Sequence, residues 1–407
     1  MHETKESDSA ASRSAPPPLR VLHLITRFIL GGAQENTLLS CRYQHEDGHE
    51  VILAHGPIYG PEGSLGRRAD AAGFRREELP SMVRAVHPWK DRAAYRQCRK
   101  LIRKLKPDVV HTHSSKAGIL GRAAAWAEKV PAVVHTIHGL PFHPYQNSLS
   151  RRLYIAAERW AARRCHRIVC VADAMARQAL AAGVGRREQY LTVYSGMQIE
   201  RFAEASDDRQ RTRAELGLDD EDRVVGTVAR LAELKGHDDL LEGLAALMKK
   251  NPRIKLLWVG DGWWRPRLEK RIASLNLSDR VKITGLVDPQ EIPKMIRAMD
   301  LLVHPSYREG LARALPQALL CSVPVVSYDC DGASEVCLDG QTGRLVDTGD
   351  RGALAEAVEQ MLEDPTSARA MAEAGRSLCL ERFDARFMAR RLIEVYRDVL
   401  HSQGGTA

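Results

Sequence analysis

The stretch LLVHPSYREGLARALPQALLCSVPVVSY, residues 301–328, shows the pattern that decides the fold. It begins with the apolar run 301–305, passes through Glu-Gly-Leu at 309–311, continues as a helical segment and ends in a second apolar run at 323–328. Two short apolar runs joined by a helix are typical of a strand, helix and strand in a parallel sheet. We expect residues 309–311 to begin the helix, directly after the first strand.

The same alternation extends along the chain in both directions. Strands are expected at 20–25, 50–55, 108–113, 132–137 and 167–172, and again at 223–228, 255–260, 280–285, 301–305 and 323–328. The pattern restarts after SGMQIERF at 195–202, and 407 residues exceed what one hydrophobic core usually organises. The sequence therefore predicts an α/β protein with two parallel-sheet domains and a ligand cleft between them, at the carboxyl ends of the strands.

The predicted boundaries divide the chain into four parts. Residues 1–18 are rich in Ser, Pro and charge and are expected to be a disordered tail. The first domain spans 19–199, and a helix at 89–106 with one apolar face is expected to cover its sheet. The second domain spans 200–383. Residues 384–407 are expected to form a helix, which can pack back on the first domain, and a short tail.

Charge is unevenly divided between the halves. Residues 1–200 hold 30 lysines and arginines against 18 aspartates and glutamates, whereas the rest holds 30 against 34. A basic domain attracts nucleic acid, an anionic membrane surface or a phosphate-bearing acceptor, and charge alone does not choose among them. No secretory signal or membrane-spanning run is present, and the eight cysteines show no zinc spacing, which favours a cytoplasmic protein with reduced thiols.

Two motifs suit the binding of an anion. The first strand leads into Gly31-Gly32 and a helical segment, where glycine allows close approach and the helix offers free N–H groups. This turn lacks the third glycine and the acidic residue of a dinucleotide fingerprint, so a nicotinamide cofactor is disfavoured. In the second half Arg230 and Lys235 follow a strand, where two cations can neutralise a diphosphate. A tight turn and a solvated charge pair are the structural alternatives.

Four features follow one another in an order that resembles a known family. They are the pair Arg230 and Lys235, the turn Gly260-Asp261-Gly262, the Glu-Gly-Leu turn at 309–311 and the GxxE at 332–335. Together they resemble family 4 of the glycosyltransferases, over residues 20–400. HTHSSKAGILGR at 111–122 and HTIHGLPFHP at 135–144 are similar to bacterial members that build exopolysaccharide, capsule or lipid-linked oligosaccharide. The resemblance implies the GT-B fold, in which two Rossmann-like domains face each other across a cleft.

The resemblance also implies roles for individual residues. Gly31 and Gly32 would approach the donor phosphate, and Gly260 would lie on the donor side. The side chains of Arg230 and Lys235 would hold the diphosphate, together with the N–H groups of Gly310 and Leu311. His138 would face the transferred sugar, and Glu309 would bind its hydroxyls. Family members usually carry a second Glu eight residues after the first, which contacts the ribose. Here that residue is Gln317, whose amide accepts with a single oxygen, so donor binding is expected to be weaker by about 1–2 kcal/mol.

Metal sites are not expected. Asp329-Cys330-Asp331 matches the DxD that holds a metal in the other large glycosyltransferase fold, but it lies where the resembled family has a donor-side turn, and it offers few oxygen ligands. The histidines of HTH at 111–113 and HTIH at 135–138 could form a zinc cluster, although no carboxylate or thiol completes it. Packed or hydrogen-bonded histidines are the favoured interpretation, with a substrate role for His138.

Two further positions leave alternatives open. Lys116 could bind an acceptor phosphate, or it could simply lie in the first turn of a helix that Ser114 or Ser115 caps. Trp263 and Trp264 could stack on a base, although packing between helices is more common for aromatic residues after a strand.

The function that the resemblance implies is transfer of a hexose from a nucleoside-diphosphate sugar, with uridine favoured, to a hydroxyl of a bacterial polysaccharide or lipid-linked glycan. Retention of anomeric configuration is implied, with no cofactor and no metal. No nucleic-acid partner is expected, whereas the inner face of an anionic membrane would suit a lipid-phosphate acceptor. A sugar-nucleotide epimerase of the same fold is an alternative, as is a non-catalytic binding homologue, which Gln317 suggests.

Overall fold

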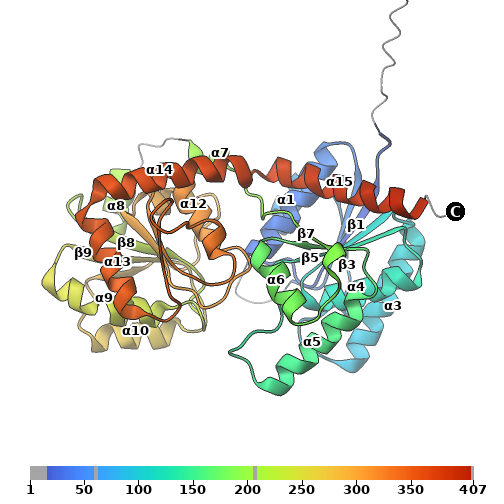
Figure 1. The fold of residues 1–407 in the computed structure, drawn as a ribbon, viewed down its shortest axis with the longest axis horizontal. Coiled ribbons are helices and arrows are strands. Elements are labelled where there is room, and N and C mark those ends of the chain that lie inside the picture. Colours follow the sequence, from blue (N-terminus) through green and yellow to red (C-terminus); the bar gives the residue numbers. More distant parts are fainter. Residues whose placement is uncertain (1–15, 59–62, 205–208, 405–407) are drawn as a thin grey trace, which may run out of the picture.

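The computed structural model of the chain describes residues 16–58, 63–204 and 209–404. The predicted tails at the two ends fall partly outside the described residues, at 1–15 and 405–407. Two α/β lobes stand side by side, the first formed by the N-terminal half and the second by the C-terminal half (Figure 1). Each lobe contains one parallel sheet covered by helices.

The first domain has a seven-stranded sheet in the order β3-β2-β1-β4-β5-β6-β7. Its strands are β1 (Arg20–Ile25), β2 (Glu50–His55), β3 (Arg75–Glu78), β4 (Val109–His113), β5 (Ala132–Ile137), β6 (Arg167–Cys170) and β7 (Tyr190–Thr192). Its helices are α1 (Gly32–Glu46), α2 (Gly66–Ala71), α3 (Pro88–Leu105), α4 (Ser115–Ala127), α5 (Ser148–Ala162) and α6 (Asp173–Ala181), with a 3-10 turn η1 (Arg187–Gln189). The strand order reverses between β1 and β4, which is where open α/β sheets bind ligands.

The second domain has a six-stranded sheet in the order β10-β9-β8-β11-β12-β13. Its strands are β8 (Arg223–Val228), β9 (Ile254–Val259), β10 (Val281–Ile283), β11 (Leu301–His304), β12 (Val325–Tyr328) and β13 (Arg344–Val346). Its helices are α8 (Arg209–Leu216), α9 (His237–Lys250), α10 (Arg265–Ser274), α11 (Ile292–Arg297), α12 (Ala314–Leu320) and α13 (Arg351–Glu363), with a 3-10 turn η2 (Ala333–Glu335). The strand order reverses between β8 and β11. Each sheet therefore has its switch point at a pair of inner strands, β1 and β4 in the first sheet and β8 and β11 in the second.

The chain crosses between the domains twice. It passes into the second domain through the short helix α7 (Glu200–Ala203) and returns through α14 (Pro365–Arg382) and α15 (Ala385–Gly404). Figure 1 shows α14 along the second lobe and α15 along the first. Met388, Leu392 and Tyr396 of α15 are buried in the core of the first domain, so the C-terminal helix is a structural part of it.

The predicted fold class, two parallel-sheet α/β domains, is confirmed. β1 and β8 have the predicted bounds, because each is a buried apolar run. The strands β3, β7 and β13 were not predicted, since each has only three or four residues that are mostly half-buried or exposed and no apolar run marks it. Across the described residues, no helix combines the length and apolar character needed to span a bilayer.

Candidate active site

A cleft of about 1610 Å³ lies between the two domains. Its lining comes largely from loops that follow β1, β5, β8, β9 and β11, and therefore from the carboxyl ends of both sheets. Ten predicted site residues line it together: Gly31, Gly32, His138, Arg230, Lys235, Gly260, Glu309, Gly310, Leu311 and Gln317. The structure thus brings residues from both halves of the chain into one cavity.

Lys235 and Glu309 form an ion pair within this cleft. Lys235 lies just before α9, and Glu309 lies in the loop after β11. Burial alone would raise the pKa of Glu309, but the charge of Lys235 and the nearby His304, whose Nε2 lies 3.2 Å from the carboxylate, lower that pKa overall. The carboxylate is therefore ionised at neutral pH, and it can accept hydrogen bonds from hydroxyl groups while it lies beside the ammonium of Lys235.

The turn at 309–311 does not begin the helix as expected, because α12 starts at Ala314. Its backbone is held by two tertiary hydrogen bonds instead. The N–H of Glu309 donates to Oδ2 of Asp331 over 2.6 Å, and the carbonyl of Gly310 accepts from the N–H of Gly332 over 3.2 Å. The prediction was wrong because these bonds, and not helix propensity, fix the turn. Gly310 and Leu311 line the cleft from a loop.

Glycines let backbone segments approach closely around this cavity. A Cβ at Gly310 would lie 1.9 Å from the carbonyl oxygen of His138, so a side chain there would push the two domains apart. A Cβ at Gly236, whose φ is 71°, would lie 1.9 Å from the carbonyl oxygen of Pro305. Close approach at these two glycines brings the 309–311 turn to His138, and the segment of Lys235 to the loop after β11.

Arg230 lies two residues after the end of β8 and lines the cleft. Its guanidinium lies 5.8 Å from the ring of Trp263, which is 61% exposed and lines the cleft. A Cβ at Gly260 would lie 2.2 Å from the carbonyl oxygen of Ala229, so the loops after β8 and β9 pack tightly. Trp264 also lines the cleft, and it packs on the core of the second domain.

Arg313 also lines the cleft, and sequence reasoning missed it. Its Nη1 donates to Oγ of Ser195 over 2.7 Å, and its Nη2 lies 3.5 Å from Oε2 of Glu35. The same side chain packs beneath Gly32, where a Cβ would lie 2.9 Å from its Cδ. The guanidinium therefore adds a cation to the predicted pair of Arg230 and Lys235. A basic residue soon after Glu-Gly-Leu was the only signal for it in the sequence.

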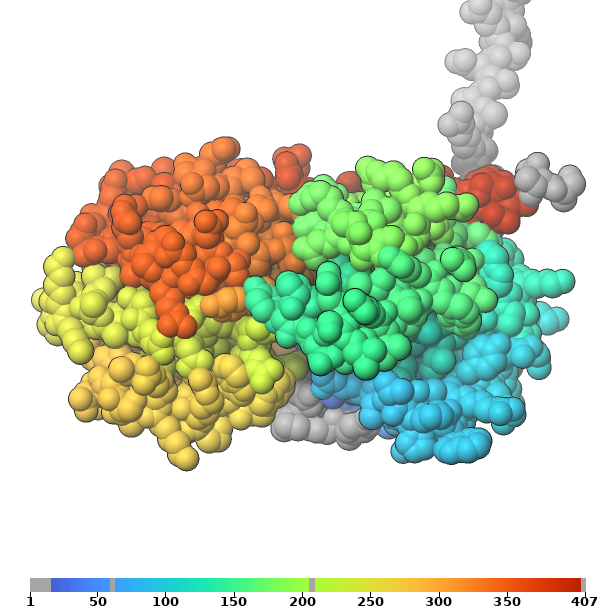
Figure 2. Space-filling model, turned by 60° about the horizontal axis from the view of Figure 1, so that its bottom comes forward, coloured from blue at the N-terminus to red at the C-terminus, as the bar shows by residue number. Residues whose placement is uncertain are grey.

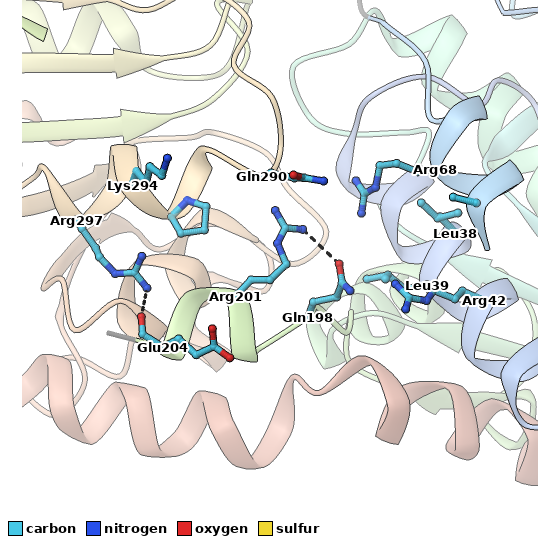
Figure 3. Close-up of a pocket in the computed structure, with 12 residues that line it drawn as sticks. Leu38, Leu39, Arg42, Arg68, Gln198, Arg201, Glu204, Gln290, Lys294 and Arg297 are labelled. Atoms are coloured by element: carbon cyan, nitrogen blue, oxygen red, sulfur yellow. Dashed lines mark hydrogen bonds between the residues drawn. The ribbon is translucent and has the colours of Figure 1, made fainter. Parts of the chain in front are cut away.

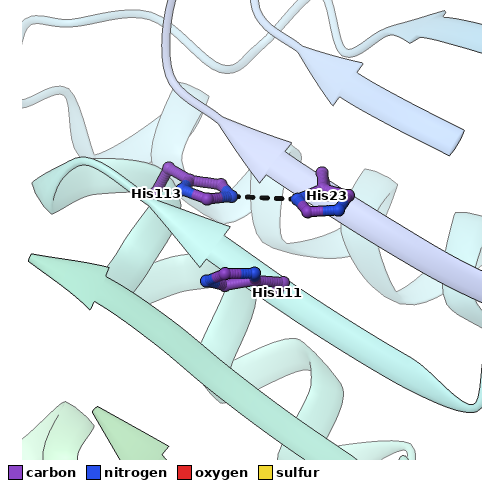
Figure 4. A group of neighbouring side chains, drawn as sticks. All are labelled: His23, His111 and His113. Atoms are coloured by element: carbon purple, nitrogen blue, oxygen red, sulfur yellow. Dashed lines mark hydrogen bonds between the residues drawn. The ribbon is translucent and has the colours of Figure 1, made fainter. Parts of the chain in front are cut away.

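His138 begins a chain of buried, hydrogen-bonded side chains. Its Nε2 lies 3.0 Å from Nδ1 of His113. Nε2 of His113 lies 3.0 Å from Nδ1 of His23, whose Nε2 lies 2.9 Å from Oε1 of Gln44 (Figure 4). Burial lowers the pKa of His23 to about 4, and burial with the charge of Arg313 lowers that of His138 to about 3, so these rings are neutral at pH 7.

The direction of this chain fixes the tautomer of each ring. The amide oxygen of Gln44 can only accept, so His23 donates from Nε2 and accepts at Nδ1. His113 therefore donates from Nε2 to His23 and accepts at Nδ1 from Nε2 of His138. Nδ1 of His138 is left as a hydrogen-bond acceptor. The imidazole can thus receive a hydroxyl proton in a hydrogen bond, but it cannot donate one from Nδ1.

His111 joins the same polar group. One nitrogen each from His23, His111 and His113 lies within 4.8 Å of the others, which is compact enough to hold a metal (Figure 4). Nδ1 of His111 lies 2.6 Å from the hydroxyl of Tyr396, and its Nε2 lies 2.7 Å from the hydroxyl of Thr136. All six ring nitrogens of these three histidines therefore have hydrogen-bond partners. The arrangement supports the hydrogen-bonded interpretation, because a metal would have to displace existing bonds.

Asp331 is occupied by structural contacts. One carboxylate oxygen accepts from the N–H of Glu309, and the other accepts from Nε2 of Gln178 over 2.7 Å. Asp329 and Asp331 border a separate cavity of about 480 Å³ and are not among the residues that line the larger cleft. Asp331 thus shapes the turn that carries Glu309.

Lys116 lies apart from the other predicted site residues. Its Nζ lies 2.5 Å from Oδ1 of Asp91 and also donates to the carbonyl of Ala85. It is not among the residues that line the cleft, and it lies in the first turn of α4.

Comparisons with known proteins agree with this geometry. Residues 208–378 match the model of the glycosyl transferases group 1, and residues 30–201 match that of Glycosyltransferase Family 4. The chain is 30% identical over 318 residues to 2-deoxystreptamine glucosyltransferase of Streptomyces kanamyceticus, which covers 76% of this chain and 82% of that protein. The chain belongs to glycosyltransferase family 4.

A further relative and a solved structure are also similar to this chain. The chain is 26% identical over 355 residues to the UDP-Gal:alpha-D-GlcNAc-diphosphoundecaprenol alpha-1,3-galactosyltransferase of Escherichia coli, over 86% of this chain and 90% of that protein. The structure of HepE from Anabaena, in complex with UDP, matches with a TM-score of 0.78 at 23% identity, over 93% of this chain and 100% of that one. The predicted family, its GT-B fold and glycosyltransferase activity are thus confirmed.

Proposed function

We propose that this glycosyltransferase moves a hexose from a uridine-diphosphate sugar to a hydroxyl of a polysaccharide or lipid-linked glycan, with retention of configuration. The observation that carries the proposal is the pair of Lys235 and Glu309, which share one cleft with His138. The name of the Escherichia coli relative pairs a UDP-sugar with a diphosphoundecaprenol acceptor, and HepE has been solved with UDP-glucose. Both support a uridine donor.

In this proposal the diphosphate lies against Arg230, Lys235 and Arg313. These cations stabilise the negative charge that grows on the leaving phosphate oxygen as its bond to C1 of the sugar breaks. Glu309, ionised and beside Lys235, accepts hydrogen bonds from sugar hydroxyls. A further sugar hydroxyl donates to Nδ1 of His138, the one ring nitrogen that the buried chain leaves as an acceptor.

The carboxylates of the cleft favour retention. Inversion needs a carboxylate that is free to act as a base on the face opposite the leaving group. Among the described lining residues, Glu35, Asp261 and Glu309 are ion-paired, and the fourth carboxylate, Glu233, is exposed. In the proposal the departing phosphate oxygen takes the proton of the acceptor hydroxyl, while the acceptor oxygen bonds to C1 on the same face.

The leaving-group end of the cleft also suits catalysis without a metal. Three cations can neutralise a diphosphate there, which is the task that a divalent ion performs in other enzymes. Both carboxylate oxygens of Asp331, one of the two aspartates of the DxD, already accept hydrogen bonds.

Product analysis tests this proposal. The protein is incubated with UDP-, GDP- and ADP-linked hexoses, with and without saccharide or polyprenol-linked acceptors, and the acceptors are examined by mass spectrometry. We expect the mass of one hexose to be added to an acceptor when a UDP-hexose is present. An isomerised nucleotide sugar without transfer would instead assign the chain to an epimerase, and no reaction with any donor would contradict both enzymes.

Contact with an anionic membrane forms part of this proposal. Leu149, Leu153 and Trp160 of α5 are 66%, 64% and 42% exposed, and their spacing places them on one helix face. Arg151 and Arg152 are exposed beside them. This segment stands at the front of the first lobe in Figure 2. Exposed apolar side chains flanked by arginines suit the interface of an anionic bilayer, where a lipid-linked acceptor would be found.

Vesicle sedimentation tests the membrane contact. We expect binding to phosphatidylglycerol vesicles that salt weakens, and weaker binding by the double variant Leu149→Ser, Leu153→Ser. Leu286→Ser is the matched control, because Leu286 is 56% exposed in the second domain. Equal binding to neutral vesicles, or loss of binding in the control alone, would contradict the contact.

A further inference from the structure

We propose that a second anion site, separate from the donor position, lies at the hinge between the domains and binds a phosphate monoester. The site is a cavity of about 580 Å³ (Figure 3). One acidic residue, Glu204, lines it. Five cationic side chains also line it: Arg42, Arg68, Arg201, Lys294 and Arg297.

The cations of this cavity come from three parts of the molecule. Arg42 and Arg68 belong to α1 and α2 of the first domain, Arg201 to the crossing helix α7, and Lys294 and Arg297 to α11 of the second domain. Figure 3 shows Arg68 and Arg201 directed into the same space from opposite sides. A ligand held by these side chains would touch both domains and the segment that joins them.

Two of the guanidinium groups have only neutral acceptors. Arg201 donates to Oε1 of Gln198 over 3.2 Å and to the carbonyl of Pro289 over 2.6 Å. Arg297 donates to backbone carbonyls, that of Phe202 over 2.8 Å among them. Within the described part of the chain, neither guanidinium has a carboxylate at ion-pair distance. Two guanidinium groups without an ion-pair partner match the two negative charges of a phosphate monoester, and arginine binds phosphate oxygens in pairs.

The remaining cations are already compensated. Arg42 pairs with Glu46 over 2.6 Å, and Lys294 pairs with Glu291 over 3.0 Å. Burial lowers the pKa of Arg201. The negative charge of Glu35 raises this pKa, whereas the positive charge of Arg68 lowers it. Like charges held together in a half-buried space destabilise each other, so an anion between them would be favoured.

The cavity is larger than a phosphate group and has an apolar side. Leu38 and Leu39 of α1 are buried there, as is Pro293 of α11. An inorganic ion would leave most of the cavity unfilled, whereas the organic part of an ester can occupy it. The size of the cavity therefore favours a phosphate monoester over free phosphate.

The hinge cavity is linked to the donor cleft. Arg68 lies 3.2 Å from Oε1 of Glu35, and Oε2 of the same carboxylate lies 3.5 Å from Arg313. An anion that binds Arg68 would weaken the ion pair between Arg68 and Glu35. Glu35 would then pair only with Arg313, a cation of the cleft. This coupling rests on the proposed function, whereas the anion site does not.

Calorimetric titration with phenyl phosphate, in saturating UDP so that the donor cleft is filled, tests the site. We expect one binding site per chain, with affinity at least tenfold lower in Arg201→Gln and in Arg297→Gln. Lys282→Gln, which removes an exposed charge on β10, should leave the affinity unchanged, as should Lys235→Ala. An unchanged melting temperature shows that each variant is folded, and unchanged UDP affinity is a second check for every variant except Lys235→Ala. If Arg201→Gln is unstable, Arg297→Gln tests the same site.

Absence of binding to the wild-type protein would overturn the proposal, as would binding that Lys235→Ala abolishes and Arg201→Gln retains. Competition by vesicles that contain phosphatidic acid identifies the source of the monoester. Displacement of phenyl phosphate assigns the site to a lipid phosphate, and no displacement assigns it to a soluble ester. Either result supports the site. Binding is measured without turnover, so failure of the transferase proposal would not affect the outcome.

Discussion

Nδ1 of His113 lies 3.0 Å from Nε2 of His138 and connects a residue of the donor cleft to the interior of the first domain. Because His113 accepts there, Nδ1 of His138 is left as a hydrogen-bond acceptor, which in the proposed function receives a sugar hydroxyl. The buried chain ends at Gln44, whose Nε2 lies 3.3 Å from the hydroxyl of Tyr396 on the C-terminal helix. The orientation of a cleft residue thus depends on groups that never meet the substrate.

Replacing His113 with Phe keeps a ring in the sheet but removes the acceptor for His138. We expect kcat/KM to fall by about tenfold, the effect of losing one well-placed hydrogen bond. Thr136→Val is the matched control, because it breaks a bond of His111 in the same buried group without touching the chain to His138. If steady-state kinetics show equal losses in both variants, the effect is one of stability and not of orientation.

Replacing Lys235 with Ala removes a cation from the leaving group. Turnover should fall by about two to three orders of magnitude, as when a preorganised transition-state partner is lost. Lys282→Ala, at an exposed position on β10, should leave kcat unchanged. Turnover of Lys235→Ala within a few-fold of the wild type would mean that the ammonium serves only to pair with Glu309.

Replacing Glu309 with Gln keeps the shape of the side chain and removes its charge. The loss should appear in kcat/KM, because an amide accepts sugar hydroxyls less well than a carboxylate. An unchanged kcat/KM for the donor would show that Glu309 does not bind the sugar.

Acid should destabilise the first domain. The pKa of His23 is lowered to about 4 and that of His138 to about 3, from 6.5, and those of His111, His113 and His135 are lowered well below 6.5, in each case mainly by burial. Between the folded and unfolded pKa values the unfolded chain binds more protons, so the free energy of unfolding falls as pH drops below 6.5. His23 alone contributes about 3 kcal/mol to this loss.

Urea unfolding at a series of pH values measures this effect. We expect the free energy of unfolding to fall steeply between about pH 6.5 and 4, and less steeply in His135→Asn, which removes one titrating group. His401→Gln alters an exposed histidine and should leave the slope unchanged. A slope that is equally steep in both variants would show that other groups cause the acid sensitivity.

Gln317 lies on α12 and lines the cleft, where the family usually places a Glu on the ribose. The substitution Gln317→Glu should restore two strong acceptors and tighten UDP binding by up to about tenfold, with little change in turnover. Calorimetric titration of both proteins with UDP measures the difference. Weaker binding would mean that the site has adapted to the amide, and equal binding that residue 317 does not contact the nucleotide.

The sequence predicted what is local and periodic. The bounds of β1 and β8 followed from uninterrupted apolar runs, and the cleft residues followed from motifs at the ends of strands. Arg313 could not be assigned, because its contacts with Ser195 and Glu35 form only when the domains meet. The turn at 309–311 was mistaken for a helix start for the same reason, since Asp331 holds it from a later segment.

The link from His138 to Gln44 was equally hidden from the sequence. The bonded rings lie on β1, β4 and just after β5, and only the parallel register of the sheet brings them together. In the sequence alone, each histidine looks like an ordinary residue in or next to a strand. The amide that orders their tautomers lies on α1, and nothing in its sequence context marks it.

The most direct test of the central claim is the anomeric configuration of the product made from an α-linked UDP-hexose in the presence of EDTA, observed by NMR as the product first forms. We predict an α-linked product, formed at a rate that added manganese does not raise, since Arg230, Lys235 and Arg313 stabilise the leaving group and, among the described residues that line the cleft, three of the four carboxylates are ion-paired. A β-linked product, or activity lost in EDTA and restored by manganese, would contradict the account.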